Sequence, residues 1–67
     1  MRKLREARVS RRLTLIELGH ILGADPGGLS RIERGRQQPS IALAKKLAAF
    51  YGMTLDEIFQ EQQNEAA

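Results

Sequence analysis

Arginine side chains gather in one short stretch of this chain, SRIERGR, residues 30–36. Each guanidinium can donate two parallel hydrogen bonds, either to O6 and N7 of a guanine or to the oxygens of a phosphate. Ser30 adds a hydroxyl that reaches the same kinds of acceptor at shorter range. These residue types favour contact with nucleic acid, and the alternative is a set of charges that simply lie in water.

The positions of these side chains on a helix predict different roles. Arg31 falls on the side opposite the apolar Leu29, which favours it as the reader of a base, with a phosphate contact or a solvated charge as the alternatives. Ser30 could touch a base edge or a backbone oxygen. Arg34 and Arg36 are candidates for phosphate contacts.

Two short helices joined by a tight glycine turn are expected to position these side chains, within residues 14–35. Leu18 and Leu22 lie one helical turn apart in the first helix, and the glycine that follows ends it. Asp25 can cap the second helix, whose expected bounds are 25–34. This arrangement is how small proteins present one helix to the major groove of DNA.

Caps and apolar spacing predict three further helices. Their expected bounds are 2–11, 41–51 and 55–60. No stretch shows the alternation of a strand, so the chain is expected to be all-α. The last residues, 61–67, are polar and small, and we expect a frayed C-terminal tail there.

Four segments of the chain, LTLIELGHILG, SRIERG, QQPS and GMTLDEIF, follow one another in order. With this spacing the chain resembles the lambda-repressor-like helix-turn-helix family, also called Cro/CI-type or Xre, from about Leu4 to Phe59. The resemblance implies a compact five-helix domain over residues 1–60, with the helix-turn-helix at about 14–34. It also implies binding to double-stranded DNA, usually as a dimer.

The resemblance implies roles for particular residues as well. Arg34 and Arg36 lie where the family contacts the DNA backbone. At the start of the second helix, Thr14 is the residue expected to contact a phosphate. Arg8 and Glu33 match a family pair that forms a partly buried ion pair between the first and third helices. That pair would fix the recognition helix on the body of the domain.

The chain departs from the family at the start of the third helix, where Pro26, Gly27 and Gly28 replace polar side chains that usually touch bases. One interpretation is that the backbone at Gly27 and Gly28 approaches the groove closely, and the other is that the glycines reflect drift or unusual backbone angles. Either way, DNA shape is expected to contribute to discrimination. A further departure is Gly19, where alanine is usual.

Large apolar side chains concentrate near the C-terminal end of the chain. Several of them are expected to close the core, and the rest to form a two-fold dimer surface. The candidates for the dimer surface are Phe50, Met53, Leu55, Ile58 and Phe59.

Charge is distributed unevenly along the 67 residues, whose net charge is +3. Residues 1–36 carry nine lysines and arginines and four acids, a formal charge of +5. Residues 37–67 carry two lysines and four acids, a formal charge of −2. The basic half contains the candidate recognition helix, which fits a side that faces phosphates.

Several classes of function are disfavoured by the composition. The chain has no cysteine and a single histidine, His20, so we expect no metal site, and no motif indicates a cofactor or catalysis. No apolar run approaches the roughly 20 residues of a membrane helix, and nothing resembles a signal peptide, so a cytoplasmic protein is expected.

The sequence therefore predicts a homodimeric transcriptional regulator, repressor-like, that binds a pseudo-palindromic operator in double-stranded DNA with sequence selectivity. The alternative is a protein-interaction module, such as an antitoxin-like or adaptor protein, for which DNA binding is secondary. Salt-dependent binding to duplex DNA separates the two.

Overall fold

The computed structural model describes the backbone of residues 2–66 and the side chains of residues 2–60. It consists of five α-helices, with no strand in the described part of the chain. In chain order they are α1 (Arg2–Ser10), α2 (Leu15–Leu22), α3 (Pro26–Glu33), α4 (Ile41–Tyr51) and α5 (Leu55–Ala66). The all-α, five-helix prediction is thereby confirmed, and none of these helices is long and apolar enough to cross a membrane.

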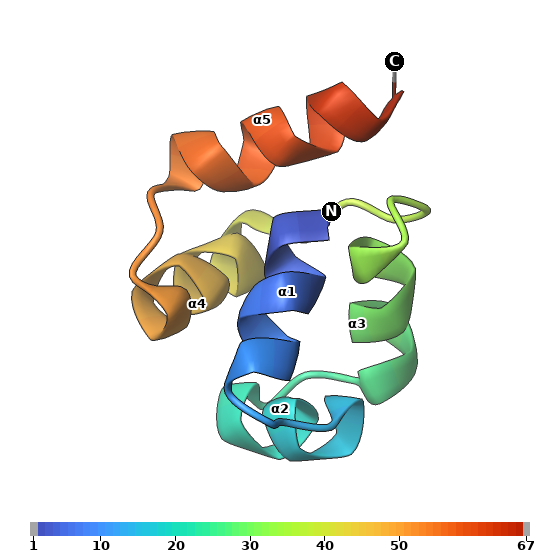
Figure 1. The fold of residues 1–67 in the computed structure, drawn as a ribbon, viewed down its shortest axis with the longest axis vertical. Helices are drawn as coiled ribbons and strands as arrows, with labels where there is room; N and C mark the ends of the chain where they lie inside the picture. Colours follow the sequence, from blue (N-terminus) through green and yellow to red (C-terminus); the bar gives the residue numbers. More distant parts are fainter. Residues whose placement is uncertain (1, 67) are drawn as a thin grey trace.

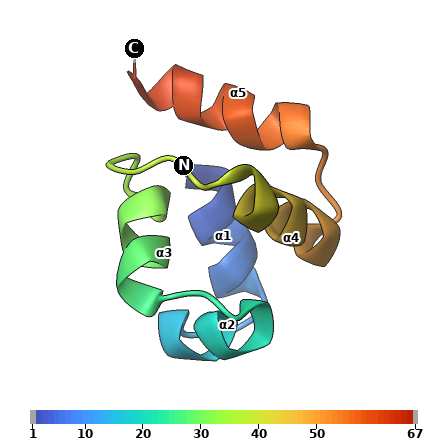
Figure 2. The same ribbon diagram turned by 180° about the vertical axis from the view of Figure 1, so that it is seen from behind.

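The helices pack around α1, which contacts both α3 and α5 (Figures 1 and 2). α2 packs against α3 and α4 at one end of the molecule, and α5 crosses the opposite end, where it packs against α4. In both views α3 forms one edge of the molecule, so one of its faces is open to solvent.

One apolar core receives side chains from all five helices. Burying a leucine or isoleucine contributes about 1.5–3 kcal/mol, so this core supplies most of the stability that such a small domain can have. Its members are Leu4, Leu18, Leu22, Leu29, Ile32, Ala44, Leu47, Tyr51 and Ile58.

Local signals in the sequence explain where the helices begin and end. Thr14 and Glu17 form a reciprocal capping box at the start of α2, and Thr54 and Glu57 form the same arrangement at α5. Ser40 caps α4 by accepting a hydrogen bond from the N–H of the third helical residue. These contacts satisfy donors that the first turn of a helix would otherwise leave unpaired, and they confirm the predicted starts.

Helix boundaries differ from the expected ones in three helices. α1 ends at Ser10 instead of residue 11. α3 spans Pro26–Glu33, because Asp25 is an extended cap outside the helix with φ −70° and ψ 125°. α5 continues to Ala66 instead of ending at residue 60, since the glutamates and glutamines beyond residue 60 favour helix. The expected frayed tail, 61–67, has side chains that lie outside the described residues.

The burial of two isoleucines does not follow from the spacing of apolar residues along their helices. Ile58 was expected at a dimer surface, but it is fully buried, with 0% of its area exposed. Ile41 continues the apolar spacing of α4, yet 67% of it is exposed. Spacing along one helix gives the apolar stripe, whereas the packing of neighbouring helices decides which edge of that stripe is covered.

The structure explains why position 19 is a glycine, which the spacing of residues along the helix does not. A Cβ added at this position would lie 2.6 Å from the carbonyl oxygen of Ala24, and 3.3 Å from the ring of Pro26. The obstacle is backbone, which cannot turn aside as a flexible side chain does. The link between α2 and α3 therefore runs too close to α2 for the alanine that is usual in the family.

We expect Gly19→Ala to destabilise the domain by about 1–3 kcal/mol, because overpacking at the α2–α3 junction outweighs the gain in helix propensity. Urea unfolding followed by circular dichroism measures this change. Gly23→Ala provides a comparison, since its penalty comes from the positive φ of 66° and not from a clash. An unchanged or raised midpoint for Gly19→Ala would contradict the close approach.

Candidate nucleic-acid interface

The start of α3 depends on its cap, since the glycines of the first turn have no side chains that could pack against the rest of the domain. Asp25 Oδ2 accepts a hydrogen bond of 2.9 Å from the N–H of Gly28, and Pro26 occupies the first helical position with its φ already suitable. Gly28 is buried and its N–H already donates to Asp25, so a backbone approach there stays a prediction. Gly27 is exposed and remains the place where the backbone can come close to a partner.

Arg31 lies over this glycine turn. Its Nε donates a hydrogen bond of 2.8 Å to Oε1 of Gln37, and its NH2 lies 3.9 Å from Oδ2 of Asp25. A Cβ added at Gly27 would come within 3.5 Å of NH1, so the guanidinium occupies space next to the bare first turn. The side chain is 55% exposed, whereas Leu29 is buried, which confirms the predicted orientation of the helix.

The contact with Gln37 could not be found from the sequence. Gln37 lies six residues after Arg31, beyond the end of α3, and helical periodicity says nothing about where a loop side chain points. The only available signal was its place in the QQPS segment, which identifies the loop but not the geometry.

The two other arginines of this stretch leave α3 at its C-terminal end. Arg34 is the C-terminal cap of the helix and Arg36 follows Gly35, whose φ of 73° turns the chain away. Both arginine side chains are exposed, and Ser30 is half-buried. Exposed arginines at a turn are suited to phosphates.

At the start of α2, Thr14 is exposed but its hydroxyl oxygen accepts a hydrogen bond of 3.1 Å from the N–H of Glu17. The hydroxyl hydrogen remains available to a phosphate. The backbone N–H of Thr14 bonds to the Glu17 carboxylate and lowers the pKa of that carboxyl below its usual value. A carboxylate ionised at neutral pH opposes a phosphate here, which limits this end of α2 to the Thr14 hydroxyl.

Arg8 and Glu33 form the predicted ion pair. Arg8 Nε and NH2 donate to the two carboxylate oxygens of Glu33 at 2.8 and 3.1 Å, and NH1 donates to the carbonyl oxygen of Leu13 at 2.8 Å. Only 13% and 8% of the two charged side chains are exposed. The hydrogen bond with Glu33 raises the pKa of Arg8 above its ordinary value, so the guanidinium is charged at neutral pH.

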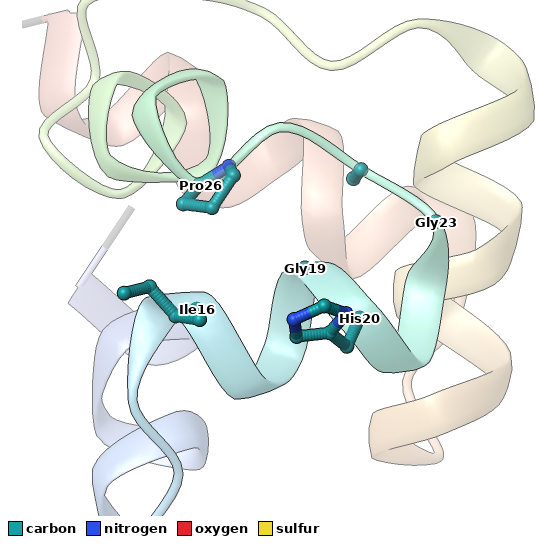
Figure 3. A pocket seen from close by; sticks show the side chains of 6 residues that line it. Ile16, Gly19, His20, Gly23 and Pro26 are labelled. Atoms are coloured by element: carbon teal, nitrogen blue, oxygen red, sulfur yellow. The ribbon is translucent and has the colours of Figure 1, made fainter.

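A shallow, open hollow of about 290 Å³ lies between α2 and the start of α3 (Figure 3). Ile16, Gly19 and His20 line it from α2, and Pro26 lies across from them at the start of α3. Among the side chains that the structure describes, no group of three histidines, cysteines or acids could hold a metal ion. The candidate binding chemistry lies with the exposed arginines of α3 and of the loop that follows it.

Comparison with known proteins gives a consistent result. A family model described as helix-turn-helix matches residues 4–58. An uncharacterized HTH-type transcriptional regulator of Methanocaldococcus jannaschii is 35% identical over 63 residues, which cover 94% of this chain and 96% of the relative. The cryptic phage CTXphi transcriptional repressor RstR of Vibrio cholerae is 31% identical over 61 residues, covering 91% of this chain and 55% of the relative. No solved structure gives a significant match.

Proposed function

The chain belongs to the Cro/CI-type helix-turn-helix family, and from this premise we propose that it is a homodimeric transcriptional repressor that binds an operator in double-stranded DNA with sequence selectivity. The two relatives, a transcriptional regulator and a transcriptional repressor, support this class of function and not an enzymatic one. The observation that carries the proposal is the exposed face of α3, on which Arg31 extends over a first turn without side chains.

The proposed mode of binding places α3 in the major groove. Arg31 donates two hydrogen bonds to a guanine, and the exposed Gly27 allows the helix backbone to approach the base edges. Arg34, Arg36 and Thr14 bind phosphates on either side and fix the register of the helix. Ser30, half-buried beside Arg31, contributes a short-range contact to a base or to the backbone.

Selectivity in this scheme rests on few direct contacts. Pro26, Gly27 and Gly28 offer no side-chain hydrogen bonds to the bases, so one arginine supplies most of the direct readout in each subunit. The shape of the operator adds discrimination at positions that no side chain touches. An occupied operator then excludes RNA polymerase from an overlapping promoter, which is how such a regulator represses.

We expect binding to duplex DNA to weaken steeply with salt, because each phosphate contact releases counterions. A plot of log affinity against log salt should have a slope of several units for a dimer, measured by fluorescence anisotropy.

In the same binding experiment, Arg31→Ala should cost about 1–3 kcal/mol on the best operator and relax the preference for one base per half-site.

Arg36→Ala is the matched control, since it removes the same group from a phosphate contact. It should weaken binding to all duplexes about equally and lower the salt slope by about one per contact removed. Equal behaviour of the two variants across sequences would contradict the division of roles. Undetectable binding at low salt would favour the protein-interaction module instead.

The proposed dimer uses apolar side chains around the α4–α5 turn. Phe50, Met53, Leu55 and Phe59 are half-buried and pack against the core within one chain, so each keeps part of its surface for a partner. Such a patch is small, and it favours weak association in free solution. On an operator the second half-site contact becomes effectively intramolecular, which strengthens binding without any new interface.

We expect sedimentation to show mainly monomer without DNA and two chains on a palindromic duplex whose half-sites lie about 34 Å apart. A duplex that carries only one half-site is the control, and it should bind one chain with much lower affinity. One chain per full operator at saturation would refute the dimer.

A further inference from the structure

We propose that Gln37 is a specificity-determining positioning residue, which holds the guanidinium of Arg31 in the orientation that reads guanine. This inference rests on the proposed function, because it concerns how the base-reading side chain is prepared for binding. The contact from which it is inferred does not depend on that function. In the free chain, Oε1 of Gln37 accepts a hydrogen bond of 2.8 Å from Nε of Arg31.

Arg31 needs such support because its surroundings on α3 are unusually bare. In most helices the side chains one turn earlier would confine a long arginine, but here those positions are Gly27 and Gly28. The second restraint, Asp25, is weaker. Its Oδ2 lies 3.9 Å from NH2, it already accepts the Gly28 N–H, and its side chain is 74% exposed. Among the described residues, Gln37 therefore provides the one short hydrogen bond to the guanidinium.

The atom that Gln37 binds decides which donors are left for DNA. A guanidinium has five N–H donors, and occupying Nε leaves the four of NH1 and NH2 without a short hydrogen bond among the described residues. These two nitrogens lie over the bare turn at Gly27 and Gly28, with NH2 3.9 Å from Oδ2 of Asp25. Two parallel N–H groups match O6 and N7 of guanine. A glutamine holds Nε without adding a negative charge, so it orients the guanidinium and leaves its attraction to DNA unchanged.

The test compares four duplexes that differ only at the base pair for which Arg31→Ala loses its preference. Gln37→Leu removes the acceptor, Gln37→Glu keeps it, and Gln38→Leu makes the same change at the next exposed loop position. We expect Gln37→Leu to lower the preference for guanine by about three- to tenfold, a typical coupling for a contacting pair. Gln37→Glu should keep the preference and only weaken overall affinity, and Gln38→Leu should change neither.

The same variants in an Arg31→Ala background show whether Gln37 acts through the arginine. If it does, Gln37→Leu has no further effect on base preference there. An equal effect in both backgrounds would mean that Gln37 reads a base itself, and no effect in the wild-type background would mean that Arg31 needs no support. Both outcomes overturn the proposal.

A measurement on the free chain separates this inference from the proposed function. Exchange of the Arg31 Nε–H with water, followed by NMR, should be slowed in the wild type and in Gln38→Leu but fast in Gln37→Leu. Fast exchange in the wild type overturns the positioning role alone. A wild-type chain that holds the hydrogen bond but shows no preference among the four duplexes contradicts the proposed function, and the specificity role with it.

Discussion

The Arg8 guanidinium is the point on which the placement of the recognition helix depends. It joins α1 and the nearby loop at Leu13 to Glu33, which lies 25 residues further along the chain at the last turn of α3. Because both charges are largely buried, each needs the other, and losing one partner would strand a charge in the protein interior. α3 has only eight residues and would not be stable alone, so its orientation is set by this contact together with its buried Leu29 and Ile32.

The two ends of α3 differ in how firmly they are held. Its C-terminal turn is fixed by Arg8, whereas its N-terminal turn contains glycines that each weaken a helix by up to about 1 kcal/mol relative to alanine. Asp25 and Pro26 offset that loss by starting the helix, and the tight junction at Gly19 brings α2 close beneath them. The buried side of α3 is therefore fixed by its contacts with the rest of the domain. The exposed side of its first turn carries few side chains, which leaves space for a partner and for the side chain of Arg31.

Sequence reasoning predicted the features that depend on neighbouring residues. The five helices, their caps and the outward direction of Arg31 follow from short-range spacing, and the Arg8–Glu33 pair came from the family resemblance. The features that sequence reasoning misplaced or missed depend on how helices and loops pack against one another. Burial of Ile58, exposure of Ile41 and the contact of Gln37 with Arg31 are decided by how helices and loops pack in space. The bond from the N–H of Gly28 to the Asp25 cap is likewise seen only in the structure.

A double-mutant cycle on Arg8 and Glu33 tests the central claim most directly. The free energy of unfolding in urea is measured for Arg8→Met, Glu33→Met and the double variant. If the buried pair holds α3 on the body, each single change costs about 2–4 kcal/mol, and the double variant costs less than their sum by at least about 1 kcal/mol. Effects that add to within about 0.5 kcal/mol would contradict it, because the two residues would then stabilise the domain independently.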